Sequence, residues 1–396
     1  MFLLKWFKFV PPWSPKTEDS SQTSIMDMPD LVMRKILEDV DLWSMLNLRK
    51  VCLAFQNFID NTNQIKLDLE LLVVRPGFDE IFMQLREPGT YNVIVIEFKK
   101  SSTGCTVEIE EGFYDRKTIT WEMTGITFLE ECEIFLDGII KNQKTPVKIF
   151  NFNFCPRRLV PKKVETRSFL GFCKRRKYIS SHFEYDDASS ERNHTETLGM
   201  MEQLLKLRKR KFQVEQLSID IFGPDQIRKV LENIEDEALK TVTINRVQRN
   251  NEKSDIERFD LDKIMDYCPL ADVRKLRVQN AILTSPLYPI SHLQKIYITV
   301  EKLSAEDLLL SLKASTFLTS NLKTGIIRYN NVVYERELIS SLGPPCYKDW
   351  NKLLWYFGIP EQNRCLELRI YRDAMDFKAM ERKRVPPSYE VTEMMY

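Results

Sequence analysis

The chain has 396 residues, of which 43% are apolar and 29% charged, with 58 Lys and Arg against 57 Asp and Glu. This length and balance are typical of a soluble globular protein with two or three domains, and they exclude a largely disordered chain. The formal net charge is only +1, so the chain as a whole lacks the excess of basic residues expected of a protein that binds nucleic acids or membrane surfaces.

Residues 1–24 are predicted to be a leader and linker without regular structure. An apolar face over residues 2–10 is followed by Pro11, Pro12 and Pro15, which end any helix early. An interfacial membrane anchor is the alternative for this apolar start. A transmembrane helix is not expected, because no stretch offers about 18–20 apolar residues.

Residues 25–64 show three short helical periods. Asp27 can cap a helix that begins near Pro29. Met33, Ile36, Leu37 and Val40 then recur at the spacing of one helical face, and two further apolar stripes lie within residues 42–59. Such a small bundle buries little apolar surface by itself, so a partner is expected.

This segment resembles an F-box, the motif that docks on the Skp adaptor of cullin ubiquitin ligases. The family's opening Leu-Pro is Met28-Pro29 here, its first helix matches residues 32–37, and its next run matches residues 40–52, VDLWSMLNLRKVC. Met in place of Leu, and the lack of a tryptophan in the third helix, are departures. A generic helical mini-bundle is the alternative. The resemblance implies contact with the Skp adaptor, and through it the cullin, by Met28, Pro29, Val32, Ile36, Leu37, Val51 and Cys52.

Strand periodicity follows the helical segment. Alternating residues predict strands at 65–71, 93–98, 106–110 and 118–121. From residue 147 onward an apolar alternation recurs after helical stretches, and it predicts strands at 150–154, 214–219, 239–244, 273–278 and 293–298. Helices are predicted between them, around 227–234, 261–265 and 304–312.

This alternation predicts an α+β or α/β fold, with a small three-helix F-box followed by an irregular leucine-rich-repeat-like strand–helix domain. A compact α/β domain is the alternative. Residues 194–334 also resemble the FTH domain, which follows the F-box in a large nematode family. We therefore expect a strand-rich first part of the repeat-like domain at 65–193, an FTH-like part at 194–340, and a C-terminal helical segment and tail at 341–396.

The alternation also predicts which strand residues face solvent. Leu217, Val242, Leu276 and Ile296 should point inward. Their neighbours should form an exposed surface for a protein target, with target-binding positions at Asp220, Asn245, Arg277 and Tyr297, of which Arg277 and Tyr297 are the strongest candidates because these residue types are enriched in interface hot spots. The other members of this predicted outward set are Asn151, Asn153, Ser218, Thr243, Gln279 and Thr299.

No pattern in the chain indicates catalysis or a cofactor. The eight cysteines form no CxxC pair and the three histidines are far apart, so neither a metal site nor a nucleophile with its base is expected. Two basic clusters, at 156–178 and 206–211, could neutralise phosphates. A solvated loop or nuclear-import signal and a helix C-terminus, respectively, are the simpler interpretations.

The predicted function is that of a non-catalytic substrate-recognition subunit of an SCF-type cullin ubiquitin ligase. The F-box would bind the Skp adaptor, and the C-terminal domain would bind an unknown protein target, with no cofactor and no small-molecule substrate. Cytoplasmic or nuclear localisation is expected, because scattered single cysteines are typical of a reducing compartment. An F-box-like interaction scaffold outside any ligase and an RNA-binding repeat protein are the alternatives.

Overall fold

The computed structural model divides the chain into two compact units, Met1–Ile65 and Lys66–Tyr396. The expected leader (1–24), most of the basic segment 156–178 and the helices expected around 261–265 and 304–312, apart from Leu308, lie outside the described residues. The structure describes residues 25–38, 40, 44–45, 48, 51–61, 68–111, 117–143, 145–154, 157–160, 182–185, 187–208, 210–247, 258–259, 272–284, 293–302, 308, 324–331, 335–359 and 363–393.

The first unit packs short helices around an apolar core. A 3-10 helix, η2 (Ile25–Asp27), precedes helix α1 (Asp30–Glu38), and helix α3 (Leu53–Asn61) follows later in the chain. The carbonyl of Pro29 accepts the first hydrogen bond of α1 from the Val32 N–H at 2.9 Å, so the proline stands where its missing N–H is not needed. The core consists of Met33, Leu37, Met45, Phe55 and Ile59, each at most 5% exposed.

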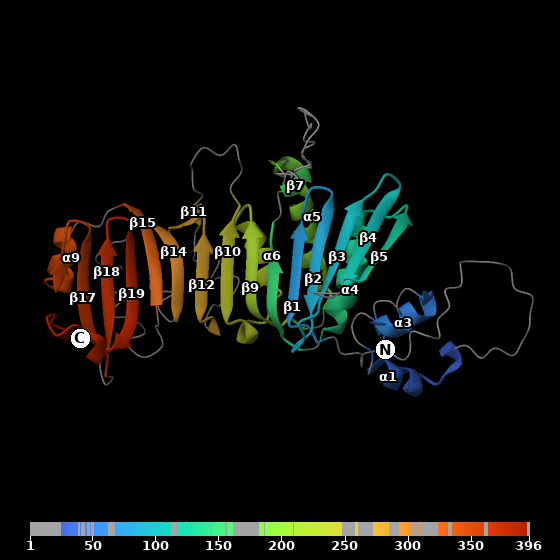
Figure 1. Ribbon diagram of the computed structural model, residues 1–396, viewed down its shortest axis with the longest axis horizontal. Helices are drawn as coiled ribbons and strands as arrows, with labels where there is room; N and C mark the ends of the chain where they lie inside the picture. The colour runs from blue at the N-terminus through green and yellow to red at the C-terminus, as the bar shows by residue number, and fades with distance from the viewer. Residues whose placement is uncertain are drawn as a thin grey trace, which may run out of the picture. The chain divides into compact units, whose positions relative to one another are not determined.

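Within the described residues of the second unit, 18 strands form one continuous mixed sheet (Figure 1). Its first part is an antiparallel meander in which each strand pairs with the next. The connections between these strands are only a few residues long, which suits antiparallel neighbours. The strands are β1 (Leu71–Pro76), β2 (Glu80–Arg86), β3 (Val93–Lys100), β4 (Gly104–Glu111) and β5 (Lys117–Thr124).

The middle of the sheet is parallel. Strand β1 pairs in parallel with β6 (Val147–Phe152), and each later main strand adds beside the previous one. These strands are β9 (Val214–Ile221), β10 (Thr241–Arg246), β12 (Lys275–Gln279), β14 (Lys295–Lys302) and β15 (Thr324–Asn331). Two short strands, β11 (Arg258–Phe259) and β13 (Ile282–Leu283), extend this part, and β7 (Arg157–Val160) pairs separately with β8 (His182–Tyr185).

The sheet returns to antiparallel pairing at its C-terminal end. Strand β15 pairs with β19 (Ala374–Glu381), which pairs with β18 (Arg364–Tyr371) and then β17 (Lys352–Ile359). Two short strands, β16 (Tyr347–Lys348) and β20 (Thr392–Glu393), also pair with β17. Gly325 makes the junction possible, because a Cβ at this position would overlap the ring of Phe377 on β19.

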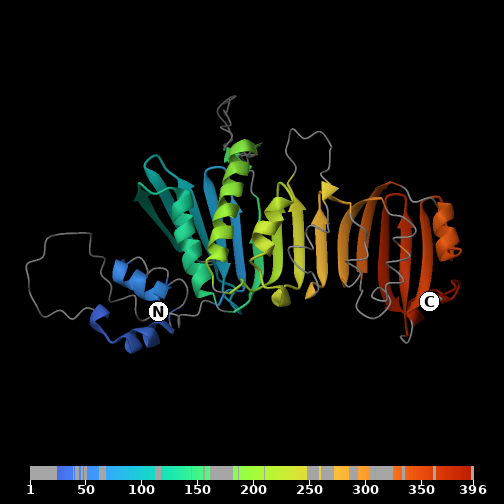
Figure 2. The ribbon, with the colours of Figure 1, turned by 180° about the vertical axis from the view of Figure 1, so that it is seen from behind.

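Helices α4 (Phe128–Asn142), α5 (Asp187–Lys206) and α6 (Asp225–Leu231) cover one face of the sheet (Figure 2). A capping box starts α4: Thr127 Oγ1 accepts from the Glu130 N–H at 3.2 Å, and the Thr127 N–H donates to Glu130 Oε2 at 2.7 Å. Buried apolar side chains of the helices meet the inward side chains of the strands. They include Phe135, Leu136, Leu198, Met201, Ile227 and Val230.

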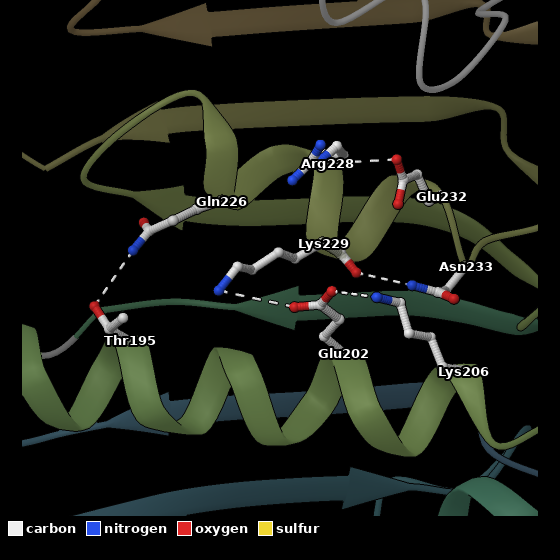
Figure 3. A network of polar contacts seen from close by, with 8 residues as sticks. All are labelled: Thr195, Glu202, Lys206, Gln226, Arg228, Lys229, Glu232 and Asn233. Carbon is white, nitrogen blue, oxygen red and sulfur yellow. Dashed lines mark hydrogen bonds and ion pairs between the residues drawn. The ribbon is translucent and has the colours of Figure 1, made fainter.

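Polar contacts tie α5 to α6 (Figure 3). Lys229 Nζ lies 3.8 Å from Glu202 Oε2, and the Gln226 side-chain N–H donates to Thr195 Oγ1 at 3.3 Å. Lys206 also contacts Glu202, at 2.5 Å. The short 3-10 helices η3 (Asp236–Ala238) and η6 (Arg382–Arg384) and helix α9 (Glu335–Leu342) complete the described elements.

The predicted fold class is wrong. We expected a small helical F-box and a leucine-rich-repeat-like domain of alternating strands and helices, whereas the second unit is dominated by a long mixed sheet with antiparallel ends. The alternation of apolar residues predicts a strand, but it does not predict whether that strand pairs in parallel or antiparallel with its neighbours. Direction depends on the connections, and those between β1 and β5 are too short for a crossover helix.

The prediction of a helical segment at 341–396 is also wrong. Helix α9 ends at Leu342, and the rest of the described segment consists mainly of β16–β20. Strand β17 is buried on both faces, so its sequence KLLWYFGI shows no alternation between apolar and polar residues. Such a run does not identify a strand by its period.

Candidate functional site

The first unit carries a set of apolar side chains that its own core leaves exposed. Leu31 is 78% exposed, Val51 57%, Val32 43% and Met28 42%. Large apolar residues scattered singly on a surface are normal, but several on one small bundle mark a surface that a partner can cover.

The seven predicted adaptor contacts divide between this surface and the core. Met28, Pro29, Val32, Val51 and Cys52 are exposed, and Ile36 is half-buried. Leu37 is 1% exposed and belongs to the bundle core. Val32 and Ile36 are one helical turn apart on α1, so they lie side by side next to the buried pair Met33 and Leu37.

Sequence reasoning missed Leu31, the most exposed of these apolar residues. The helical spacing places Leu31 outside the apolar stripe that contains Met33 and Leu37. An apolar residue outside that stripe is itself a sign of a second contact surface, and it could have been used to find Leu31. A set of exposed or half-buried apolar positions of the first unit, taken together, is called the apolar F-box surface below; its members are Met28, Pro29, Leu31, Val32, Ile36, Val51 and Cys52.

The second surface is the face of the sheet opposite α4, α5 and α6. The inward residues were predicted correctly: Leu217 and Val242 are 1% exposed, and Leu276 and Ile296 are fully buried. The residues of the predicted outward set that pair across neighbouring strands share the other face. Ser218 pairs with Asn151 and Thr243, Thr243 with Arg277, and Arg277 with Tyr297.

Asp220 and Asn245 belong to a hydrogen-bonded ladder. Asp220 Oδ2 accepts from the backbone N–H of Phe154 at 2.9 Å, and its Oδ1 accepts from Asn245 Nδ2 at 3.1 Å. Asn245 Oδ1 in turn accepts from Asn280 Nδ2 at 2.9 Å, with Asn280 turning the chain at a φ of 56°. Burial raises the pKa of the Asp220 carboxyl, against the effect of these hydrogen bonds. The ladder engages both side chains within the protein, so they are less available to a target.

His194 lies beneath this ladder. Its Nε2 lies 3.0 Å from the Asp220 carbonyl oxygen, and its ring meets Phe152, Phe154 and Phe222 edge to face. Burial lowers the pKa of His194 to about 4, so the ring is neutral at neutral pH and its Nε2 N–H can donate to that carbonyl. No motif or spacing in the sequence singled out this histidine.

Arg277 and Tyr297 are arranged differently from Asp220 and Asn245. The Arg277 guanidinium lies over the Tyr297 ring, 5.9 Å from its centre, and Arg277 is exposed. Both side chains therefore remain on the surface. Of the four predicted target-binding residues, these two lie outside the ladder; Arg277 is exposed and Tyr297 is half-buried.

The second basic cluster makes internal contacts at the end of α5. Arg208 donates to the Gln143 carbonyl at 3.1 Å and lies over the Phe212 ring, and Lys211 lies 3.9 Å from Asp236. Burial lowers the pKa of Arg208. These contacts are the kind expected near a helix C-terminus.

Buried thiols in the described part of the chain are poorly suited to act as nucleophiles. Burial raises the pKa of Cys105 to about 11, and it also raises the pKa of Cys132 and Cys365. A reactive cysteine needs a lowered pKa, because the thiolate is the nucleophile. In the parts of the chain that the structure covers, no helix is long and apolar enough to span a membrane.

Comparisons with known families identify two domains. An F-box domain model matches residues 25–66, and an FTH domain model matches residues 195–340. These matches confirm the predicted architecture of an F-box followed by an FTH domain. No curated protein and no solved structure matches the chain.

Proposed function

We propose that this chain, in which an F-box domain precedes an FTH domain, is the substrate-recognition subunit of an SCF-type ubiquitin ligase. An F-box domain indicates a substrate-adaptor role of the SCF type in general, together with binding to an Skp-type adaptor. The observation that carries the proposal is the apolar F-box surface, which lies beside a separately filled core.

The division between core and surface supports adaptor binding. Met33, Leu37, Phe55 and Ile59 hold the bundle together, so Val32, Ile36 and their exposed neighbours remain for a partner. Covering apolar surface contributes about 25 cal/mol per Å², which makes this surface a favourable contact without any change in the bundle.

The receptor would act through proximity and not through bond chemistry. It would hold a target beside a charged ubiquitin-conjugating enzyme and so raise the effective concentration of the target's lysines. Target binding is assigned to the second unit, on the face that carries Arg277 and Tyr297.

Adaptor co-purification tests the proposal. The full-length double variant Val32→Glu, Ile36→Glu should lose at least tenfold in Skp adaptor binding, because a charge desolvated at an apolar contact costs several kcal/mol. Tyr91→Glu is the matched control, since Tyr91 is 93% exposed but lies in the second unit. The control should bind the adaptor as the wild type does.

Two further measurements complete the test. The single variant Leu31→Glu, at a position 78% exposed, should weaken the adaptor complex without disturbing the core, which guards against a misfolded double variant. Undiminished adaptor binding by both variants would overturn the proposal. Adaptor binding by the wild type without recovery of the cullin would instead identify a scaffold outside the ligase.

A further inference from the structure

The open face of the sheet is strongly basic over four neighbouring strands. The cross-strand pairs Lys275–Lys295, Lys295–Thr324 and Thr324–Lys378 form one row across β12, β14, β15 and β19. Two further rows lie beside it, at two and at four residues from it along each strand. They contain Arg277, Tyr297, Ile326 and Asp376, and then Gln279, Thr299, Arg328 and Ala374.

These twelve residues, called the basic face below, include five cations and one carboxylate. Arg277, Lys295, Arg328 and Lys378 are exposed, and Lys275 is half-buried. Within the described part of the chain no ion pair is recorded for any of the five, although ion pairs are common elsewhere on the unit, as at Lys99–Glu108 and Lys148–Glu70. The five cations therefore outnumber the one carboxylate of this face, and among the described residues none of them is held in a direct ion pair, although Glu367 on β18 is the cross-strand neighbour of Lys378.

Apolar surface lies in the middle of the basic face. Tyr297 and Ile326 are directly paired across β14 and β15, and Ile326 is 38% exposed. Arg277 lies on one side of this pair and Asp376 on the other. A partner that fits must place an apolar group on Tyr297 and Ile326 and negative charge around it.

The basic face has a limit on each side. On β9 and β10, Asp220 and Asn245 are held in the ladder. On β17 and β18, residues 385–391 pack over Leu354, Tyr356 and Cys365, which share the open face, so the sheet is covered there. Four strands at about 4.8 Å spacing leave a stretch that five or six residues of extended peptide can span.

We infer that the basic face binds an extended acidic peptide segment with a large apolar side chain, supplied by the protein target. The inference rests on the proposed function for its biological use, because it names the kind of segment that the ligase receptor would capture. Glutamate or aspartate side chains of the segment contact the five cations, and its apolar side chain covers Tyr297 and Ile326.

A peptide fits this surface better than a nucleic acid. Single-stranded nucleic acids are bound by successive aromatic side chains on which bases stack. Among the twelve residues Tyr297 is the sole aromatic, and the Arg277 guanidinium already lies over its ring. Asp376, in the same row, would repel a continuous phosphate backbone, whereas a peptide can place an uncharged residue there.

Fluorescence anisotropy with the full-length chain tests the inference. The probe is a fluorescein-labelled peptide with a central phenylalanine between two runs of four glutamates. We expect saturable binding that weakens as salt rises from 50 to 300 mM, because exposed charges are screened over a Debye length of about 8 Å at physiological ionic strength. The variant Arg277→Glu, Lys295→Glu should bind the peptide at least tenfold more weakly.

A matched charge reversal separates local from general electrostatics. Lys141→Glu with Arg192→Glu changes the net charge equally, on helices α4 and α5 at the covered face. That variant should bind the peptide within twofold of the wild type. An equal loss in both variants, or no loss in either, would overturn the inference.

Two altered probes test the chemistry of the ligand. Replacing the central phenylalanine by alanine should weaken binding several-fold, and equal affinity would contradict the role of Tyr297 and Ile326. A ten-nucleotide oligouridine RNA should not compete, and tighter binding of this RNA would overturn the assignment to a peptide. Arg277→Glu, Lys295→Glu should retain the Skp adaptor, so loss of peptide binding and loss of adaptor binding report on the two proposals separately.

Discussion

At the scale of single residues, His194 is the buried titratable group with the clearest consequence for stability. It is fully buried, contacts three phenylalanine rings, and has a pKa of about 4 in the folded protein. An unfolded histidine has a pKa of about 6.5. Between these two values the unfolded chain binds a proton that the folded chain does not, so stability falls as pH falls.

We therefore predict that this histidine destabilises the protein in mild acid. The loss of unfolding free energy is absent above about pH 6.5. It reaches roughly 2 kcal/mol at pH 5, because each pH unit between the two pKa values contributes about 1.36 kcal/mol. Urea unfolding at pH 7 and pH 5 measures it, and His194→Gln should lose this part of the pH dependence. The raised pKa of Asp220 acts with the opposite sign, because the folded chain then takes up a proton more readily than the unfolded chain. An unchanged difference between pH 7 and pH 5 in the variant would show that His194 is protonated when folded.

At the scale of elements, the parallel strands show what alternation can predict. Strands β9, β10, β12 and β14 were found from the sequence because each buries every second residue against the helices. Leu217 on β9 is 1% exposed, while its neighbour Ser218 lies on the open face. The assignment of each residue to a face follows from this period of two.

Alanine substitutions test the assignment of faces. Leu217→Ala should lower the free energy of unfolding by about 2–5 kcal/mol, because it opens a cavity between β9 and the helices. Ser218→Ala, one residue later, should change it by less than about 0.5 kcal/mol. Chemical denaturation of both variants measures the difference. Similar losses in the two would mean that the register of β9 is wrong.

The remaining elements escaped sequence reasoning for identifiable reasons. Helix α4 was missed although Thr127 and Glu130 have the spacing of a capping box. The ladder from Asp220 through Asn245 to Asn280 could not be predicted, because its members come from β9, β10 and the turn after β12. In the same way, the sequence predicted that Arg277 and Tyr297 face outward, but not that β15 and β19 lie beside their strands and add Arg328 and Lys378 to the same face.

At the scale of the whole second unit, the sheet is covered on one face in its middle part and on both faces at its C-terminal end. Residues 385–391 pack over Leu354, Tyr356 and Cys365, with the ring of Tyr389 stacked on that of Tyr356 at 5.9 Å. Burial, with nearby Glu367, raises the pKa of the Tyr356 hydroxyl, which donates to the Glu367 carboxylate at 3.1 Å. A polar pair is thus enclosed together with the apolar residues.

Removing this cover should expose Cys365. A chain ending at Arg384 should react with N-ethylmaleimide at Cys365 at least tenfold faster than the full-length chain, because Cys365 is fully buried when covered. Peptide mass spectrometry provides two internal controls. Buried Cys132 should stay protected and exposed Cys52 should react in both chains. Continued protection of Cys365 in the shortened chain would show that strands β17–β19 bury it without the cover.

The order of pairing in the sheet has a consequence for synthesis on the ribosome. Most strands of the main sheet add beside the strand made just before, but three edges must wait for a distant partner. Strand β1 ends at Pro76, and its parallel neighbour β6 begins at Val147. Strand β6 ends at Phe152 and its neighbour β9 begins at Val214, while β15 ends at Asn331 and its neighbour β19 begins at Ala374. During translation each edge presents unpaired N–H and C=O groups until that partner emerges. These three intervals are when the nascent chain is most open to chaperone capture and to pairing with the wrong strand.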